Sequence, residues 1–483
     1  MDNTNVLKDE KIGKLLWKFS WPAVITMVVN SLYNIIDRIF VGRGVGDIAI
    51  AATTVAFPLM LILIAVSVLI GVGATSLISI RLGEKKPEEA ENIAGNALVL
   101  LILLPICISV IYFLFTDPIL AFFGADAEVL PYARDFTNII MAASAFGSLS
   151  MGLVNFIRAE GNPRMAMYTQ VTGTLINIVL NYIFVMRLGW GIKGSALASV
   201  CGQIFSLVWV LSYYLLGPSL LKLRLKNLQL QKNLVISITA IGFAPFAMQL
   251  AHSLQNTIMN NALMTYGGNM ALSAMGIVGS AATLLFMPII GISQGAQPII
   301  GFNYGAQQYD RVREVLKKAV IVGTVIALGG TCALQLWATE IAGLFSYNNA
   351  ELTALTAHAM SVFFLMFPVA GFQIIGSQYF QAVGKPVPST ILGLSRQLLL
   401  FVPLLLILPR YWGLEGIWRT PPIADLLSAL ITGVFVYLEM KQIKERERLQ
   451  AADSRKVTVE KAAEKEGYPV LKDQLQTAEH GGA

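Results

Sequence analysis

The sequence has little charge and few of the residues that build catalytic or metal centres. Only 13% of its 483 residues are charged, against about 25% in a typical soluble domain. It has three cysteines and three histidines, and the cysteines lie apart from one another in apolar stretches. This scarcity excludes a disulfide framework and a cysteine- or histidine-rich metal cluster. No paired carboxylates or nucleophile motif are visible either, so we expect no enzyme.

Apolar residues are what the chain has in excess. They make up 55% of the sequence, and the mean hydropathy is +0.65. A helix needs about 20 mostly apolar residues to cross a bilayer, and only helices or closed barrels satisfy the backbone there. Twelve stretches have helical length without barrel-type alternation, which predicts an all-α membrane protein with twelve transmembrane helices. They cover residues 15–40, 48–80, 93–115, 129–157, 165–187, 190–216, 234–264, 270–302, 319–345, 352–383, 388–409 and 413–440.

The positions of lysine and arginine predict the orientation of these spans. Most of the 35 basic residues lie in loops on the side of the two termini. Basic loops face the cytoplasm in membrane proteins, so we expect both termini to be cytoplasmic. This bias also accounts for the net charge of +6, and no nucleic-acid partner is expected.

The second half of the sequence repeats landmarks of the first half at a spacing of 222 or 223 residues. This spacing covers six helices, an even number, so the halves have parallel topology and a pseudo-twofold axis along the membrane normal. Transporters that work by alternating access commonly have this plan. The matched pairs include Pro22 and Pro245, Asp37 and Asn260, Gly46 and Gly268, Ala49 and Ala271, Gly73 and Gly295, and Gly83 and Gly305.

The repeat sets the predicted domains. Residues 1–219 form an N-terminal six-helix lobe, and residues 234–440 form a C-terminal one. Residues 220–233 form a cytoplasmic linker between them, which is basic and alternates apolar with polar residues, as is typical of a segment lying on a membrane surface. Residues 441–483 form a charged cytoplasmic tail.

The first predicted span carries a polar stripe. Asn30, Asn34 and Asp37 are spaced four and three residues apart, so they share one helical face beside Tyr33. Inserting an ionisable side chain at mid-membrane costs about 2.5–3.5 kcal/mol of free energy on insertion scales. Asp37 therefore suggests a function that offsets this cost. Its carboxylate could exchange a proton, hold Na⁺ together with amide oxygens, or pair with Arg38.

The fifth span carries a second stripe on one face, and the sixth span offers a matching polar edge. We expect these side chains to enclose Asp37 in a hydrophilic cavity within the first half. The alternative is that they only form hydrogen bonds between helices. The residues concerned are Gln170, Thr174, Asn177 and Asn181 on span five, and Ser199 and Gln203 on span six.

The seventh span differs from its counterpart in chemistry. It carries His252, Asn256 and Asn260, with Asn260 where the first half has Asp37. His252 could titrate near neutral pH or be a satisfied core histidine. The halves thus share a scaffold, but only the first has a carboxylate at this position. Asp37 therefore predicts that ion coupling takes place in the first half.

Other charged residues lie in or beside predicted spans. Glu160, in the loop RAEGNP, could act in gating or cation capture, or could pair with Arg158 or Arg164. Asp425 and Arg396 lie within spans and could pair with each other or with Arg419, in a structural or a functional role.

Four segments together resemble the MATE (multidrug and toxic compound extrusion) family, in its bacterial MepA-like branch. They are NSLYNIIDRIFVG, RAEGNP, NIVLNYIF and GSALAS, and the likeness extends from about residue 10 to residue 440. The resemblance implies a V-shaped pair of six-helix lobes in the bacterial cytoplasmic (inner) membrane. It also implies cation-driven efflux of bulky, often cationic aromatic drugs, and hence a role in xenobiotic transport and antibiotic resistance.

The resemblance also implies residue roles. Asp37 matches the family's coupling aspartate, Asn177 and Asn181 match its polar pair, and Ser199 stands where many members have threonine. The carboxylates that some members carry in spans seven and ten are absent here, which favours H⁺ at Asp37, with Na⁺ as the alternative. We therefore expect a coupling site of Asp37, Asn34, Asn177, Asn181 and Ser199, with substrate or gating candidates Asn30, Tyr33, Glu160, Gln170, His252, Asn256 and Asn260.

The expected function is drug/H⁺ antiport by a monomer that exports small-molecule drugs or organic cations. It would use no cofactor or bound metal beyond the coupling ion. A Na⁺-coupled drug antiporter is one alternative. A lipid-linked saccharide flippase of the same superfamily is another, and it would need a hydrophilic, cation-rich central cavity.

Overall fold

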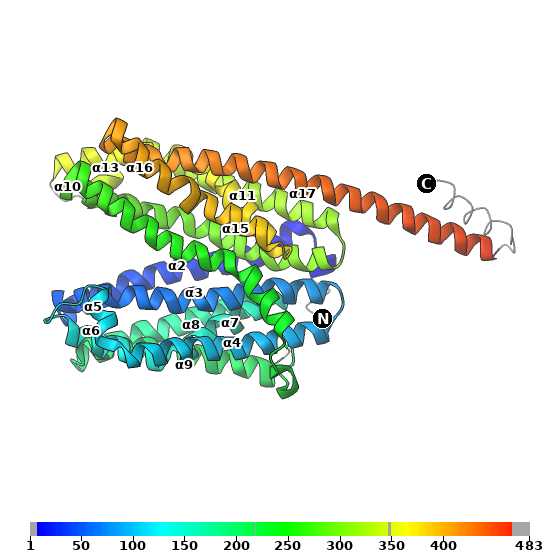
Figure 1. Ribbon diagram of the computed structural model, residues 1–483, viewed down its shortest axis with the longest axis horizontal. Coiled ribbons are helices and arrows are strands. Elements are labelled where there is room, and N and C mark those ends of the chain that lie inside the picture. The colour runs from blue at the N-terminus through cyan, green and yellow to red at the C-terminus, as the bar shows by residue number, and fades with distance from the viewer. Residues whose placement is uncertain (1–6, 218, 346–348, 466–483) are drawn as a thin grey trace. The chain divides into compact units, whose positions relative to one another are not determined.

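The computed structural model describes residues 7–217, 219–345 and 349–465, and within them the chain is helical without any strand (Figure 1). Two short stretches, η1 and η3, are π-helical, and η2 is a 3₁₀ turn. The elements are α2 (Ile12–Gly44), α3 (Asp47–Gly83), α4 (Pro87–Leu114), α5 (Thr116–Phe122), α6 (Leu130–Ala142), α7 (Ser144–Ala159), α8 (Pro163–Asn181), η1 (Tyr182–Arg187), α9 (Gly191–Leu216), η2 (Leu225–Leu228), α10 (Lys232–Gly305), α11 (Tyr309–Leu336), α12 (Ala338–Phe345), α13 (Ala350–Phe363), α14 (Phe367–Ala382), α15 (Pro386–Leu394), η3 (Ser395–Leu400), α16 (Phe401–Trp412) and α17 (Leu414–Lys465).

The helices of the described residues account for twelve membrane crossings. Nine are long and apolar enough to cross a bilayer, and the bent pairs α6–α7 and α13–α14 raise the number to 11. The 74-residue α10 supplies one more, because it is two helices joined at Gly268, where φ is 62° and ψ is −160°. The expectation of a twelve-helix, all-α membrane fold is thereby confirmed.

The backbone repeats itself at the spacing seen in the sequence. The pairs α6–α7 and α13–α14 are each bent by 51°. Lys85 and Gln307 both have a positive φ, which is uncommon for residues other than glycine. The repeat therefore preserves backbone conformation even where the residue type has changed. The glycine pairs with positive φ at the same spacing are Gly46 and Gly268, Gly161 and Gly384, and Gly191 and Gly413.

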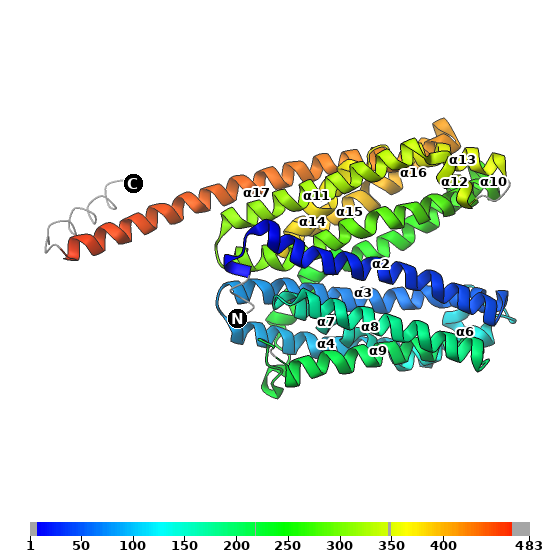
Figure 2. The same ribbon diagram turned by 180° about the vertical axis from the view of Figure 1, so that it is seen from behind.

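The chain divides by its contacts into two compact units, residues 1–433 and 434–483. The first unit contains the first six-helix half and all of the second half except the end of its last helix. There α2–α9 form one bundle, the first bundle, and the helices from α10 to Gly433 form the second bundle (Figures 1 and 2). The narrower boundaries predicted at residues 219, 233 and 440 stay predictions.

The two bundles meet where their helices lack side chains. A Cβ atom on Gly242 of α10 would lie 1.7 Å from the Leu69 carbonyl oxygen, and one on Gly83 of α3 would lie 2.0 Å from the Phe302 carbonyl oxygen. Backbone therefore touches backbone, and only glycine permits it. In both views the ribbons lie close at the end bearing the N-terminus and diverge towards the end bearing α5 and α6 (Figures 1 and 2).

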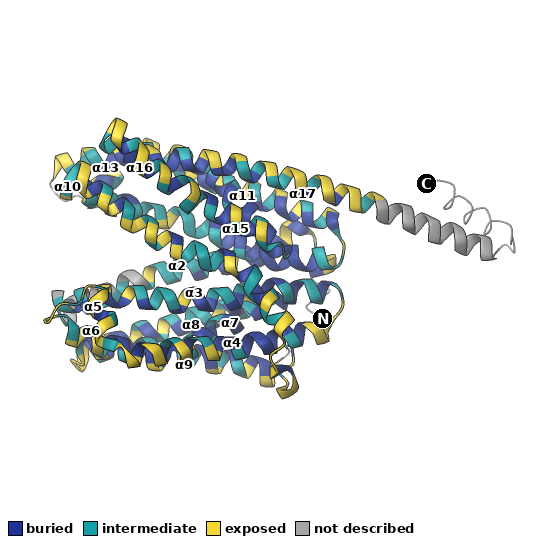
Figure 3. Ribbon diagram, viewed as in Figure 1, coloured by how far each residue is buried: buried dark blue, intermediate teal, exposed yellow. Residues whose placement is uncertain are grey.

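Burial follows this arrangement. Buried residues fill the interior of each bundle and the region where the bundles approach each other, and exposed residues lie on the outer faces (Figure 3). Large apolar side chains such as Phe122 and Leu216 are more than four-fifths exposed. In a soluble protein, extensive exposed apolar surface marks a site of contact with a partner or a membrane. In a membrane-spanning helix the contact is with lipid.

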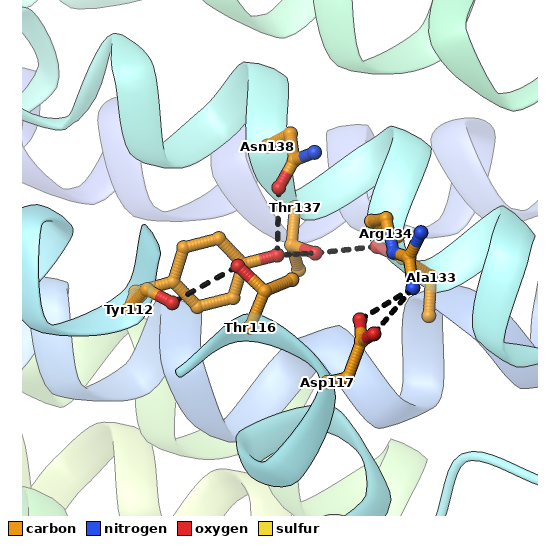
Figure 4. Close-up of polar contacts among 7 residues, drawn as sticks. All are labelled: Tyr112, Thr116, Asp117, Ala133, Arg134, Thr137 and Asn138. Atoms are coloured by element: carbon orange, nitrogen blue, oxygen red, sulfur yellow. Dashed lines mark hydrogen bonds and ion pairs between the residues drawn. The ribbon is translucent and has the colours of Figure 1, made fainter. Parts of the chain in front are cut away.

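Polar contacts close the end of the first bundle that bears α5 and α6. The Tyr112 hydroxyl lies 2.7 Å from Thr137 Oγ1 and donates to Asn138 Oδ1 at 3.0 Å. Arg134 donates to both carboxylate oxygens of Asp117 at 2.6 Å (Figure 4). A surface depression of about 330 Å³ lies beside this ion pair. Because Arg134 and Asp117 are paired with each other and half-exposed, we assign this network a structural role, which is to hold α4, α5 and α6 together.

The contact at Gly242 can be tested by adding one methyl group. We expect Gly242→Ala to lower the free energy of unfolding by about 1–3 kcal/mol, because overpacking a tight contact costs that much. Thermal unfolding in detergent measures the change. Gly279→Ala is the matched control, in the part of α10 that follows Gly268, since a Cβ there meets nothing within 4 Å. Equal melting temperatures for the two variants would show that the backbone contact is not tight.

Candidate functional site

Asp37 is the centre of a polar cluster inside the first bundle. Its Oδ1 accepts hydrogen bonds from the Asn181 side-chain amide and, at 3.3 Å, from Ser195 Oγ. Asp37 lies on α2, Asn181 ends α8, and Ser195 lies in the first turns of α9. Three helices therefore hold one carboxylate, and the two donors named are neutral.

A second layer of the cluster lies one turn away. Asn177 Nδ2 donates to Ser199 Oγ at 3.1 Å, and the Tyr33 hydroxyl lies 3.4 Å from the same oxygen. The spacing of four residues between Asn177 and Asn181 places both on one face of α8. The structure thus brings together the polar faces of α2, α8 and α9 that the sequence singles out.

Two amide oxygens in this cluster have no hydrogen-bond donor among the described residues. They are Oδ1 of Asn177 and Oδ1 of Asn181, in side chains that are 5% and 1% exposed. An unsatisfied buried polar atom costs about 1–3 kcal/mol, so it marks a place where a partner belongs. A protonated Asp37 could donate to such an oxygen, and a small hard cation could bind the carboxylate and the amide oxygens together.

Ser195 is the member of the cluster that the sequence analysis did not single out. It precedes Ser199 by four residues, so helical spacing alone places it on the same face of α9. The side chains of Asn34 and Arg38 lie outside the described residues, so the predicted roles of both stay predictions. Asn30 is half-buried on α2, two turns before Asp37.

Gln170 belongs to a different cluster, at the contact between the bundles. Its Oε1 accepts from Arg158 at 3.0 Å, and Arg158 also donates to Asn155 at 2.9 Å and to Gln294 of the second bundle at 3.4 Å. Gln297 reaches the other way and donates to Ser76 Oγ at 2.9 Å. These amides and hydroxyls supplement the glycine contacts with hydrogen bonds across the interface.

Glu160, just after α7, is fully buried and holds the chain that follows α9. Its carboxylate accepts from the Tyr213 hydroxyl at 3.3 Å, Ser219 Oγ at 2.9 Å and the Leu220 amide at 3.0 Å. The alternative of an ion pair with Arg158 was wrong, because that guanidinium donates to amide oxygens instead. Burial raises the pKa of Glu160 to about 7, and the hydrogen bonds oppose that rise only in part.

The second bundle has a different set of polar residues. Asn260, at the position equivalent to Asp37, is exposed, and His252 Nδ1 lies 3.2 Å from the exposed amide of Asn256. The buried charge lies elsewhere: Arg396 Nε donates to Asp425 Oδ1 at 2.6 Å, and Asp425 is 3% exposed.

That ion pair is fixed by its surroundings. The Arg396 guanidinium lies 4.9 Å from the centre of the Phe286 ring, and π-helix η3 presents it. Of the two pairings considered for Asp425, the one with Arg396 is correct, since Arg419 pairs with Glu415 at 3.0 Å. The second bundle therefore contains a carboxylate already neutralised by an arginine.

Comparison with known proteins finds matches in both halves of the chain. The family model MatE matches residues 22–183 and again residues 245–407. The multidrug export protein MepA of Staphylococcus saprophyticus is 23% identical over 429 residues, covering 88% of this chain and 94% of that protein. MepA of Staphylococcus aureus strain NCTC 8325 is 24% identical over 427 residues, with the same coverage.

Solved structures share the fold. One described as the outward-facing conformation of a multidrug resistance MATE family transporter of the MOP superfamily superposes with a TM-score of 0.87 at 24% identity, covering 92% of this chain and 99% of that one. A MOP superfamily transporter from Pyrococcus furiosus, for which reversed polarity of the binding pocket has been taken to suggest a different function, gives a TM-score of 0.84 with the same identity and coverage.

The buried carboxyl of Glu160 predicts a pH-dependent stability. Its folded-state pKa of about 7 lies above the ordinary value of 4.5, so folding favours the protonated form. The protein should lose stability as pH rises from about 4.5 to about 7, by on the order of 3 kcal/mol at most. Melting temperatures across this range should fall in the wild type and stay flatter in Glu160→Gln.

The matched control for this measurement is Glu88→Gln, at an exposed glutamate in the first turn of α4. It should keep the wild-type slope of melting temperature against pH. If Glu160→Gln also keeps that slope, the carboxyl is not the group whose titration weakens the fold.

Proposed function

Because the chain belongs to the MatE family, we propose that it is a multidrug exporter that expels bulky, often cationic aromatic compounds in exchange for protons by alternating access. The multi-pass helical fold and the MepA relatives, named as multidrug export proteins, support export of small molecules. The observation that carries the coupling is the Asp37 carboxylate, which accepts from the neutral side chains of Asn181 and Ser195, beside two buried amide oxygens with no donor in the part of the chain that the structure describes.

Protonation of Asp37 would rearrange this cluster. The ionised carboxylate only accepts hydrogen bonds, which suits the Asn181 amide and the Ser195 hydroxyl. The protonated carboxyl also donates a hydrogen bond. Oδ1 of Asn177 or Asn181 could accept it, because neither atom has a donor among the described residues. The two states thus prefer different arrangements of α2 against α8 and α9, which is how a proton would shift one helix.

In the proposed cycle Asp37 takes a proton from the outside, α2 shifts, and the drug is released outward. The bundles then open at the other end, where the proton leaves and the next drug binds. One proton moving inward through 100 mV supplies about 2.3 kcal/mol, enough for a roughly 40-fold gradient of a neutral drug. Both termini would then lie in the cytoplasm, as the basic loops predict.

Na⁺ is the second candidate ion, and the same amide oxygens favour it. A carboxylate and two amide oxygens are hard ligands of the kind that hold such cations. H⁺ is the ion we propose, because the described residues of the second bundle offer no comparable second cation site: the buried carboxylate of Asp425 is already paired with Arg396.

Efflux of a fluorescent cationic dye from proteoliposomes tests this coupling. With a pH gradient of one unit imposed, Asp37→Asn should reduce the dye gradient from its wild-type value, at most about tenfold for one proton exchanged per dye, towards none. The matched control is Glu88→Gln, which also replaces a carboxylate by an amide, at an exposed position at the start of α4, and which should keep the wild-type gradient.

Two results would contradict the proposal. Undiminished gradient-driven efflux in Asp37→Asn would remove the coupling role of this residue. Wild-type efflux that follows an imposed Na⁺ gradient and ignores a pH gradient would replace H⁺ by Na⁺.

A further inference from the structure

The segment that precedes α2 is bound to the second bundle, although α2 belongs to the first. Arg311 of α11 donates to the carbonyl oxygens of Leu7 at 3.0 Å and Glu10 at 2.9 Å, and to Asn303 Oδ1 at 2.8 Å. Asn303 of α10 donates to the Leu7 carbonyl at 3.4 Å. Leu7 and Asn303 are both fully buried. We call residues 7–10 the N-terminal segment.

The N-terminal segment is also tied to α2 itself. Glu10 pairs with Lys14 at 2.9 Å and with Lys18 at 3.6 Å, and both lysines lie in the first two turns of the helix. Because Arg311 binds backbone carbonyls on one side and Glu10 binds α2 on the other, any displacement of α2 from the second bundle at this end must break one set of contacts.

The segment that precedes α10 shows the reverse arrangement. Residues 219–231, the linker segment, lead into the second bundle and are bound to the first. The side chain of Asn96 on α4 donates to the Gln229 carbonyl at 3.2 Å and accepts from the Gln231 amide at 2.7 Å. Glu91 on the same helix accepts from the Lys222 amide at 3.2 Å. Buried side chains of α4 thus hold this segment, whereas its sequence is typical of one lying on a membrane surface.

We propose that these two segments are reciprocal latches, and that Arg311 is a positioning residue that stabilises the conformation in which the bundles touch at the end bearing the N-terminus. The helix that opens each half is anchored on the opposite half. Gly291 and Gly295 of α10 pack against Val24 and Ser20 of α2, so the helix bodies meet at this end too.

The consequence for transport rests on the proposed function, since alternating access requires this end to open. When the bundles separate there, the N-terminal segment must leave Arg311 and Asn303, or carry α2 away from its own bundle. Either event costs the hydrogen bonds of the half-buried Arg311 guanidinium, so the strength of this latch sets how often the end opens.

Distances between spin labels test the latch without drug or gradient. Labels at Glu88→Cys and Lys317→Cys, both exposed and one on each bundle, report the separation at this end once the three native cysteines have been replaced. Arg311→Ala and deletion of residues 2–10 should each raise the population of the longer distance at least about fivefold, as expected for loss of charge-assisted hydrogen bonds.

Two comparisons separate a latch from a general loss of structure. The double variant, Arg311→Ala with the deletion, should open no further than either single variant, because both act on one contact. Arg134→Ala, which removes an arginine paired with Asp117 at the end of the first bundle that bears α5 and α6, should keep the wild-type distances.

Unchanged distances in both Arg311→Ala and the deletion would overturn the proposal, as would additive opening in the double variant. Should Arg311→Ala fail to fold, judged by size-exclusion chromatography, the deletion decides alone, since it leaves both bundles intact. A variant of Asp37 that no longer couples export should still show the latch, so the two proposals fail independently.

Discussion

A carboxylate inside a bilayer has to be neutralised or ligated, and the arrangement around Asp37 follows from that constraint. Its ligands come from α8 and α9, so the three helices are fixed against one another through one side chain. Directly after Asn181 the chain turns into the π-helix η1. Such local π turns occur frequently at functional sites, and here one follows the residue that donates to Asp37. The polar faces of α2, α8 and α9 thus form the site, and the helix changes from α to π directly after Asn181.

The two bundles repeat the backbone and diverge in charge. Left-handed residues and bends recur at 222 or 223 residues, even where Lys85 is replaced by Gln307. The position of Asp37 becomes an exposed asparagine, while the second bundle buries an ion pair elsewhere. The Asp37 carboxylate accepts hydrogen bonds from the neutral side chains of Asn181 and Ser195, whereas the Asp425 carboxylate accepts one from the cationic Arg396. This difference supports the proposal that proton exchange takes place in the first bundle.

The sequence predicted the features that depend on periodicity. Hydropathy gave the twelve crossings, the spacing of landmarks gave the repeat, and helical spacing placed Asn177 and Asn181 on the face that meets Asp37. It did not predict partners chosen by packing. Glu160 bonds to residues about 60 positions away rather than to its neighbour Arg158, and Arg311 binds the start of the chain. Such contacts depend on how the ends of different helices pack together, and the periodicity of a single helix in the sequence does not predict that.

The proposed transport cycle depends on exchange of the Asp37 proton for drug. Proton release into a weakly buffered solution on drug addition measures this directly, with purified protein in detergent and a pH-sensitive dye. We expect about one proton released per drug bound at a pH where Asp37 is protonated, and none from Asp37→Asn that still binds drug. Drug binding by the wild type without proton release, or equal release from the Asp37→Asn variant, would contradict the claim.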